Sequence, residues 1–200
     1  GVTKILAPYF QNVYTTEDNP VMRMRLKNAF GWNTCFSSGE ETDDVLLLSS
    51  SSSKKLKFDM ISLLNVIDRC DKPLTLMRSI RTHLLRCQND DQNDENDNNN
   101  TSPPQQQQPR YLLLAVVLPW CPFVEKGNQQ AKPSEVLPMS GGGLCKEGAT
   151  FEASVEKFVA NVLIPEGFKV KAWTRVPYLC EGDGEIEYYC LDDALFLLEV

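Results

Sequence analysis

The chain has 200 residues, of which 42% are hydrophobic, and this is the size and composition of one globular domain with a full hydrophobic core. Its formal net charge of −7 argues against nonspecific binding to nucleic acid or to an anionic membrane, because both require clustered Lys and Arg side chains. No run of residues approaches the roughly 20 hydrophobic residues of a membrane-spanning helix, so we predict no membrane span.

The first elements are short. Residues 2–10 place hydrophobic side chains on one helical face, which predicts a short helix. Residues 12–16 are predicted as a strand, with Glu17 at its carboxyl end. Pro20 stands at the start of a hydrophobic helical pattern over residues 19–30, because proline is favoured in the first turn of a helix. A further short strand is predicted at residues 32–36.

The strongest strand pattern covers Phe58–Leu64 and runs directly into polar residues. These are Asn65, Asp68, Arg69 and Asp71. In open α/β sheets ligands bind beyond the carboxyl ends of the strands, so the cluster is a candidate site. An ordinary loop and helix cap explains the same residues equally well. Pro73 then opens a predicted helix to Leu85, with hydrophobic residues at three-to-four spacing.

The second half predicts a central strand at 111–118, an amphipathic helix at 151–163 and strands at 168–174 and 194–198. Residues 175–193 between the last two strands are predicted as a loop too long for a tight hairpin. Alternating helices and strands, followed by two strands without a helix between them, indicate an α/β fold. Polar or glycine-rich composition predicts disordered insertions at 37–57, 86–109 and 127–148.

Cysteine and histidine usage predicts no metal site. The seven cysteines form no C-x-x-C pair, and their odd number cannot be fully paired within the chain. We therefore expect reduced, mostly buried thiols of an intracellular protein. The single histidine, His83, lies within a predicted hydrophobic helix and has no ligand-spaced partner.

Four sequence blocks, in order, resemble the DREV (methyltransferase-like protein nine) family. They are FDMISLLNVIDRCDKPLTLMRSIR at 58–81, LLLAVVLPWCPFVE at 112–125, KPSE at 132–135, and WTRVPYLCEGD at 173–183 followed by YYCLDDALFLLE at 188–199. The resemblance implies a class I S-adenosylmethionine-dependent methyltransferase fold, Rossmann-like, with strand order 3-2-1-4-5-7-6. It also implies a protein-histidine methyltransferase that modifies the pros nitrogen of His-x-His motifs in protein substrates, where x is small, in the endoplasmic reticulum and mitochondria.

The resemblance assigns roles to five residues. Glu17 would bind the ribose hydroxyls of S-adenosyl-L-methionine, Asn65 would contact the cofactor, and Tyr178 would close over its pocket. Asp68 would hold the target imidazole, with Tyr189 near it. Structural alternatives remain: a helix-capping acid for Glu17, a turn residue for Asn65, an ion pair with Arg69 for Asp68, and core packing for the two tyrosines. The predicted loop also offers three charged groups to a substrate peptide: Arg175, Glu181 and Asp183.

The family's first strand and its L-G-x-G-D-G turn would precede Val2, so we expect this chain to be a fragment that binds S-adenosylmethionine poorly by itself. Two other functions stay open. One is a non-catalytic binding module on the same fold, and the other is a small-molecule methyltransferase.

Overall fold

The computed structural model describes residues 2–17, 19–30, 35–36, 58–89, 109–126, 129–139, 150–182 and 186–200. These residues form two compact units, divided between residues 56 and 57, and each unit is described by itself. The predicted insertion at 37–57 lies outside the described residues, as do most of the one at 86–109 and the glycine-rich part of the one at 127–148.

The first unit contains α1 (Val2–Leu6), the 3-10 turn η1 (Ala7–Tyr9), β1 (Thr15–Thr16), α2 (Pro20–Phe30) and β2 (Cys35–Phe36). The predicted helix at 2–10 is therefore an α-helix continued by a 3-10 turn, and both predicted strands are only two residues long. β1 and β2 pair in parallel, as expected when a helix connects two strands. The side chain of Asn19 caps α2 by accepting hydrogen bonds from the backbone N–H groups of Val21 and Met22, at 2.9 and 3.3 Å.

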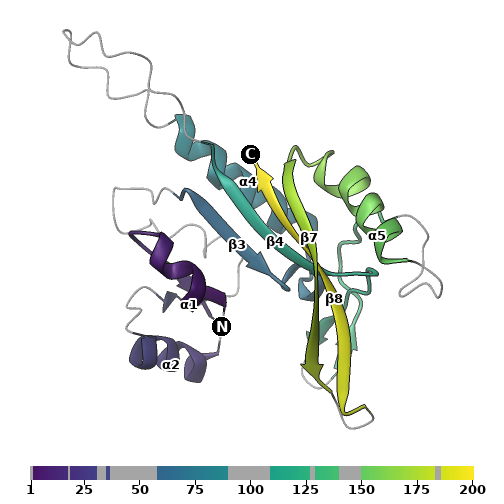
Figure 1. Ribbon diagram of the computed structural model, residues 1–200, viewed down its shortest axis with the longest axis horizontal. Coiled ribbons are helices and arrows are strands. Elements are labelled where there is room, and N and C mark those ends of the chain that lie inside the picture. The colour runs from purple at the N-terminus through teal and green to yellow at the C-terminus, as the bar shows by residue number, and fades with distance from the viewer. Residues whose placement is uncertain are drawn as a thin grey trace. The chain divides into compact units, whose positions relative to one another are not determined.

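The second unit is built on a four-stranded sheet with the order β3-β4-β8-β7 (Figure 1). Its strands are β3 (Met60–Leu64), β4 (Tyr111–Val117), β7 (Lys169–Glu181) and β8 (Tyr188–Glu199). β3 and β4 are parallel, whereas β8 runs antiparallel to both β4 and β7. A separate two-stranded hairpin joins β5 (Val124–Lys126) and β6 (Gln129–Ala131).

The predicted loop at 175–193 is wrong, because most of it belongs to β7 and β8. Residues 175–181 pair with residues 188–194 in one continuous antiparallel ladder. Aromatic and branched residues such as Val176 and Tyr188 favour strands, and Pro177 is tolerated because β7 is an edge strand. β4 pairs with β8 only at residues 193–199, so the outer halves of β7 and β8 extend beyond β4 as a two-stranded arm (Figure 1).

Two helices cover the sheet: α4 (Pro73–Asn89) and α5 (Phe151–Phe158), which the π-helical turn η4 (Val159–Leu163) continues. Thr150 caps α5 by accepting a hydrogen bond of 3.2 Å from the N–H of Ala153. Phe158 lies 5.8 Å from Phe196 of β8, ring centre to ring centre. Fully buried side chains from the sheet and both helices form one core; they include Met77, Leu84, Leu112, Leu114, Val116, Phe158, Phe196 and Leu198.

The cysteines differ from expectation. Cys121 is disulfide-bonded, so the prediction of reduced thiols is wrong there. Cys70, Cys180 and Cys190 are free, but Cys190 is exposed and the other two are half-buried rather than buried. Across the described ranges we find no cluster of three metal-ligating side chains, and no helix long and hydrophobic enough to cross a membrane.

Candidate functional site

Asn65 turns the chain at the carboxyl end of β3. Its backbone N–H donates a hydrogen bond of 3.1 Å to the carbonyl of Ala115, which continues the pairing of β3 with β4 by one residue. Its φ of 54° lies in the left-handed region, which asparagine adopts more readily than most residues. The chain then enters the 3-10 turn η2 (Ile67–Arg69), which carries Asp68 next to the end of the strand.

Asp68 is a buried carboxylate with one unsatisfied oxygen. Its side chain is 2% exposed, and Oδ2 lies 3.2 Å from Nη1 of Arg69. No group in the described part of the chain donates a hydrogen bond to Oδ1. Burial raises the pKa of Asp68 above its usual value, and the charge of Arg69 opposes that rise. A buried acceptor without a donor is costly in a purely structural position, so Oδ1 is suited to an N–H group of a ligand.

Arg69 is itself held in place. Its guanidinium lies 3.7 Å from the centre of the Phe123 ring, in a cation–π contact. The backbone N–H of Phe123 donates a hydrogen bond of 3.0 Å to the carbonyl of Asp68. The segment after β4 therefore fixes η2 from both its backbone and its side chains.

Asp193 on β8 completes the cluster, and it was not among the site residues predicted from the sequence. It is 8% exposed, and its Oδ2 accepts a hydrogen bond of 2.9 Å from Nδ2 of Asn65. Its Oδ1 receives no hydrogen bond from the residues that the structure describes. Burial raises the pKa of Asp193; the bond from Asn65 opposes the rise, and the charge of Asp68 adds to it. An acidic pair directly before the hydrophobic run ALFLLE was the available signal, but it fell in the predicted loop.

The other predicted residues are spread over the fold. Tyr189 is half-buried on β8, opposite Cys180 and four residues before Asp193, so alternation places both on one face of the strand. Tyr178 pairs with Leu191, but its side chain lies outside the described atoms. Glu17 belongs to the first unit, where its Oε1 accepts a hydrogen bond of 2.9 Å from the N–H of Asn19, the residue that caps α2.

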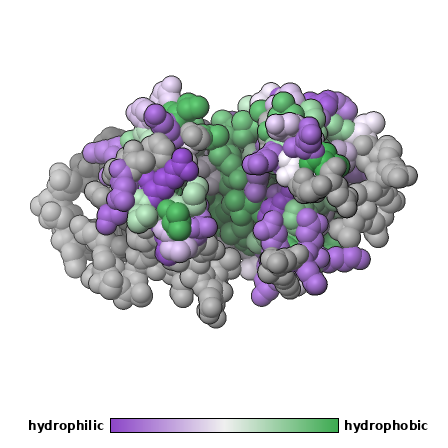
Figure 2. Space-filling model, turned by 90° about the horizontal axis from the view of Figure 1, so that it is seen from below, coloured by the Kyte–Doolittle hydropathy of each residue, from purple (hydrophilic) through white to green (hydrophobic). Residues whose placement is uncertain are grey.

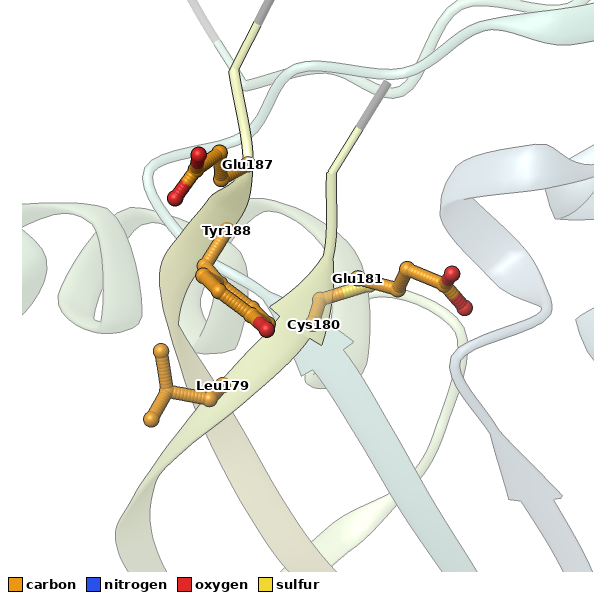
Figure 3. Close-up of a pocket in the computed structure, with 5 residues that line it drawn as sticks. All are labelled: Leu179, Cys180, Glu181, Glu187 and Tyr188. Atoms are coloured by element: carbon orange, nitrogen blue, oxygen red, sulfur yellow. The ribbon is translucent and has the colours of Figure 1, made fainter. Parts of the chain in front are cut away.

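Of the three charged groups assigned to a substrate peptide, Arg175 is already paired. It hydrogen-bonds Asp192 at 2.6 Å and Glu152 at 3.3 Å. Asp183 lies outside the described residues. Glu181 lines a hollow of 620 Å³ at the end of the β7–β8 arm, together with Leu179, Cys180, Glu187 and Tyr188 (Figure 3).

This hollow is distinct from the Asn65–Asp68–Asp193 cluster, which contributes none of its lining residues. The carboxylates of Glu181 and Glu187 point away from one another in it (Figure 3). Leu179 and Tyr188 are 75% and 66% exposed. The face of the molecule shown in Figure 2 has both hydrophobic and hydrophilic areas.

The KPSE segment anchors the loop after β6 to the start of α4. Ser134 donates hydrogen bonds to Asp71 from its backbone N–H and its hydroxyl, at 2.9 and 2.6 Å. Glu135 accepts hydrogen bonds from the N–H and the hydroxyl of Thr75, at 2.9 and 2.5 Å, and so caps α4 from outside the helix. Residues 129–139, part of the predicted insertion at 127–148, therefore support the turn that carries Asp68.

The buried carboxylates lie at the carboxyl end of a parallel strand pair in a mixed α/β sheet, and this is the edge at which open α/β folds bind their ligands. The family model for the DREV methyltransferase matches residues 1–91 and 100–200 of this chain. The chain belongs to the DREV methyltransferase family, which confirms the resemblance carried by the four sequence blocks.

Proposed function

We propose that this protein is an S-adenosylmethionine-dependent protein-histidine methyltransferase that modifies the pros nitrogen of histidine in His-x-His motifs, where x is small. The observation that carries the proposal is the buried Asp68 of a DREV methyltransferase, with one carboxylate oxygen that no described residue engages. Such an oxygen can accept a hydrogen bond from an imidazole N–H.

The proposal includes the class I methyltransferase fold. The order β3-β4-β8-β7, with β8 antiparallel to its neighbours, corresponds to the 4-5-7-6 half of the class I order. The parallel pair of β1 and β2 in the first unit corresponds to strands two and three. These two observations support the assignment independently, because they come from different units of the chain.

The polar groups at the end of β3 fit a cationic cofactor. S-adenosyl-L-methionine would supply an electrophilic methyl group on a positively charged sulfonium, together with an ammonium group. The acidic side chains of Asp68 and Asp193 make this end of the sheet favourable for positive charge, while the contact to the cofactor itself is assigned to Asn65. In the proposal Asn65 contacts the cofactor, Glu17 accepts hydrogen bonds from its ribose hydroxyls and Tyr178 closes over it.

Asp68 would act on the tautomer and the proton of the target histidine. Its carboxylate would accept the N–H of the tele nitrogen, which leaves the lone pair of the pros nitrogen free to attack. Attack by that lone pair would form the new N–CH₃ bond in place of the S–CH₃ bond, whose electron pair would stay with sulfur. The methylated imidazolium would then release its remaining N–H proton, and Asp68, which would accept the hydrogen bond from that N–H, is the group placed to take it. Tyr189 would contact the imidazole ring.

The test uses the full-length gene product. The protein is incubated with a His-Ala-His peptide and methyl-labelled S-adenosylmethionine, and NMR locates the label on the ring. We expect label on the pros nitrogen and none in peptides with Ala at both histidine positions. Normal cofactor binding without peptide labelling would contradict the histidine assignment and favour a small-molecule substrate. Absence of cofactor binding would favour a binding module.

The compartments that the resemblance implies, the endoplasmic reticulum and mitochondria, belong to the same proposal. Fluorescence microscopy of a tagged full-length product would test them.

A further inference from the structure

A hydrogen bond joins Asn65 to Asp193, the second carboxylate of the cluster. Asn65 stands at the turn that ends β3, in the left-handed conformation, and its side-chain amide is 2.9 Å from Oδ2 of Asp193. A carboxylate accepts hydrogen bonds and donates none, so Asp193 must face the NH₂ end of the Asn65 amide. The carbonyl end of that amide is thereby turned the other way.

Asp193 is placed rigidly enough to fix that orientation. It sits within the ladder of β8, where it pairs with Val117 of β4 and with Val176 of β7. The carbonyl of its neighbour Asp192 accepts a hydrogen bond of 3.0 Å from the N–H of Leu118. The backbone that carries the Asp193 carboxylate is therefore paired with a strand on each side, whereas the backbone of Asn65 lies in a turn.

The position of Asp193 is also costly in a purely structural role. The side chain is 92% buried, no described residue donates a hydrogen bond to its second oxygen, and Asp68 adds a like charge nearby. A neutral side chain of similar size would avoid both penalties. Retaining a charge in such a place is typical of functional sites.

We propose that Asp193 is a positioning residue of the candidate site, which orients the side-chain amide of Asn65 toward the methyl-donor cofactor. This inference rests on the proposed function, since Asn65 is the residue that would touch the cofactor. Asp193 acts through Asn65, so removing either residue removes the same interaction.

A double-mutant cycle on the full-length protein tests the inference, with the Kd for S-adenosylmethionine measured by isothermal titration. We expect Asp193→Ala and Asn65→Ala each to raise the Kd about tenfold or more. The Kd of the double variant should be no higher than the Kd of whichever single variant binds the cofactor less tightly, because Asp193 acts through Asn65. Additive losses would overturn the proposal, as would an unchanged Kd for either single variant.

Two further variants separate positioning from structural support. Asp193→Asn keeps the size of the side chain but adds an NH₂ donor, so it no longer forces the orientation of the Asn65 amide, and its Kd should rise, although by less than in Asp193→Ala. Asp192→Ala is the matched control, because Asp192 pairs with Arg175 instead, and its Kd should be unchanged. If Asp193→Ala does not fold, Asp193→Leu replaces it. Suppose that neither Asp193→Ala nor Asp193→Leu folds, while Asp193→Asn folds and binds the cofactor tightly. That result would mark Asp193 as purely structural and overturn the proposal.

An NMR measurement on the cofactor-free protein checks the contact itself. The side-chain NH₂ resonances of Asn65 should shift in Asp193→Ala and remain in place in Asp192→Ala; equal shifts in both would contradict the proposed orientation. Wild-type protein that binds no S-adenosylmethionine would refute the proposed function. If the wild-type protein binds S-adenosylmethionine and Asp193→Ala binds it with equal affinity, only the role of Asp193 is refuted.

Discussion

The side-chain amide of Asn65 is bonded to the carboxylate of Asp193 across 128 residues of sequence, at a distance of 2.9 Å. Asn65 follows β3 and Asp193 belongs to β8, and these strands flank β4 on its two sides. The contact therefore crosses the carboxyl end of β4 and joins the first and last strands of the second unit. Asp68 lies three residues after Asn65, so the buried acidic cluster depends on both ends of this unit.

Replacing Asp68 should separate catalysis from stability. We expect Asp68→Ala to reduce methyl transfer to a His-Ala-His peptide by about 10²–10⁴-fold, because it removes the group that would hold and accept the imidazole proton. Cofactor affinity should remain nearly the same. Labelled-peptide assays and isothermal titration on the full-length protein measure the two quantities, and undiminished transfer would remove Asp68 from its assigned role.

The same residue gives a prediction about pH. Burial raises the pKa of folded Asp68 above its ordinary value of 3.8. A group with a raised folded pKa contributes stability below its unfolded pKa and loses that contribution as pH rises through the folded pKa. Relative to Asp68→Asn, which does not titrate, the wild type should therefore become less stable from about pH 4 upward. Urea unfolding of both proteins at stepped pH measures the difference, and a gap that stays constant or reverses its slope would contradict it.

The position of Asp68 could be predicted from the sequence, whereas that of Asp193 could not. A hydrophobic strand that runs into polar residues is a local pattern, so Asn65 and Asp68 were found from neighbours in the chain. Asp193 acquires its meaning from a partner 128 residues away. Residues 175–193 were predicted as a loop, yet Pro177 lies within β7, where a proline is tolerated because the strand is at the edge of the sheet.

The KPSE segment shows the same limit. Its resemblance to the family was visible in the sequence, but its polar, proline-containing composition indicated an insertion. Only the fold shows that Ser134 and Glu135 bind Asp71 and Thr75, more than 50 residues earlier in the chain. Loop composition predicts exposure, and it carries no information about which distant helix end a loop will cap.

Glu135 should stabilise the second unit as a cap of α4. Glu135→Ala removes the two carboxylate oxygens that accept hydrogen bonds from the N–H and the hydroxyl of Thr75. We expect a loss of about 0.5–2 kcal/mol in the free energy of unfolding. Urea denaturation measures the loss. Glu156→Ala, an exposed glutamate on α5, is the control and should change stability by less than about 0.5 kcal/mol. Equal effects of the two substitutions would show that the cap contributes nothing.

Gly167 offers a test of backbone and side-chain strain at one position. Its φ is +80°, which other residues rarely adopt, and an added Cβ would lie 2.7–2.8 Å from the guanidinium of Arg81. We expect Gly167→Ala to destabilise the protein by about 1–2 kcal/mol from the left-handed backbone alone, and by more while Arg81 is present.

Two variants divide that loss. In an Arg81→Ala background the further cost of Gly167→Ala should fall toward the backbone value, because the close contact is gone. Gly167→Asn, with Arg81 again replaced by Ala, should cost less still, since asparagine tolerates the left-handed region. Thermal or urea unfolding of the set measures each step. If Gly167→Ala costs the same with and without Arg81, the guanidinium moves aside freely and the positive φ accounts for the whole effect.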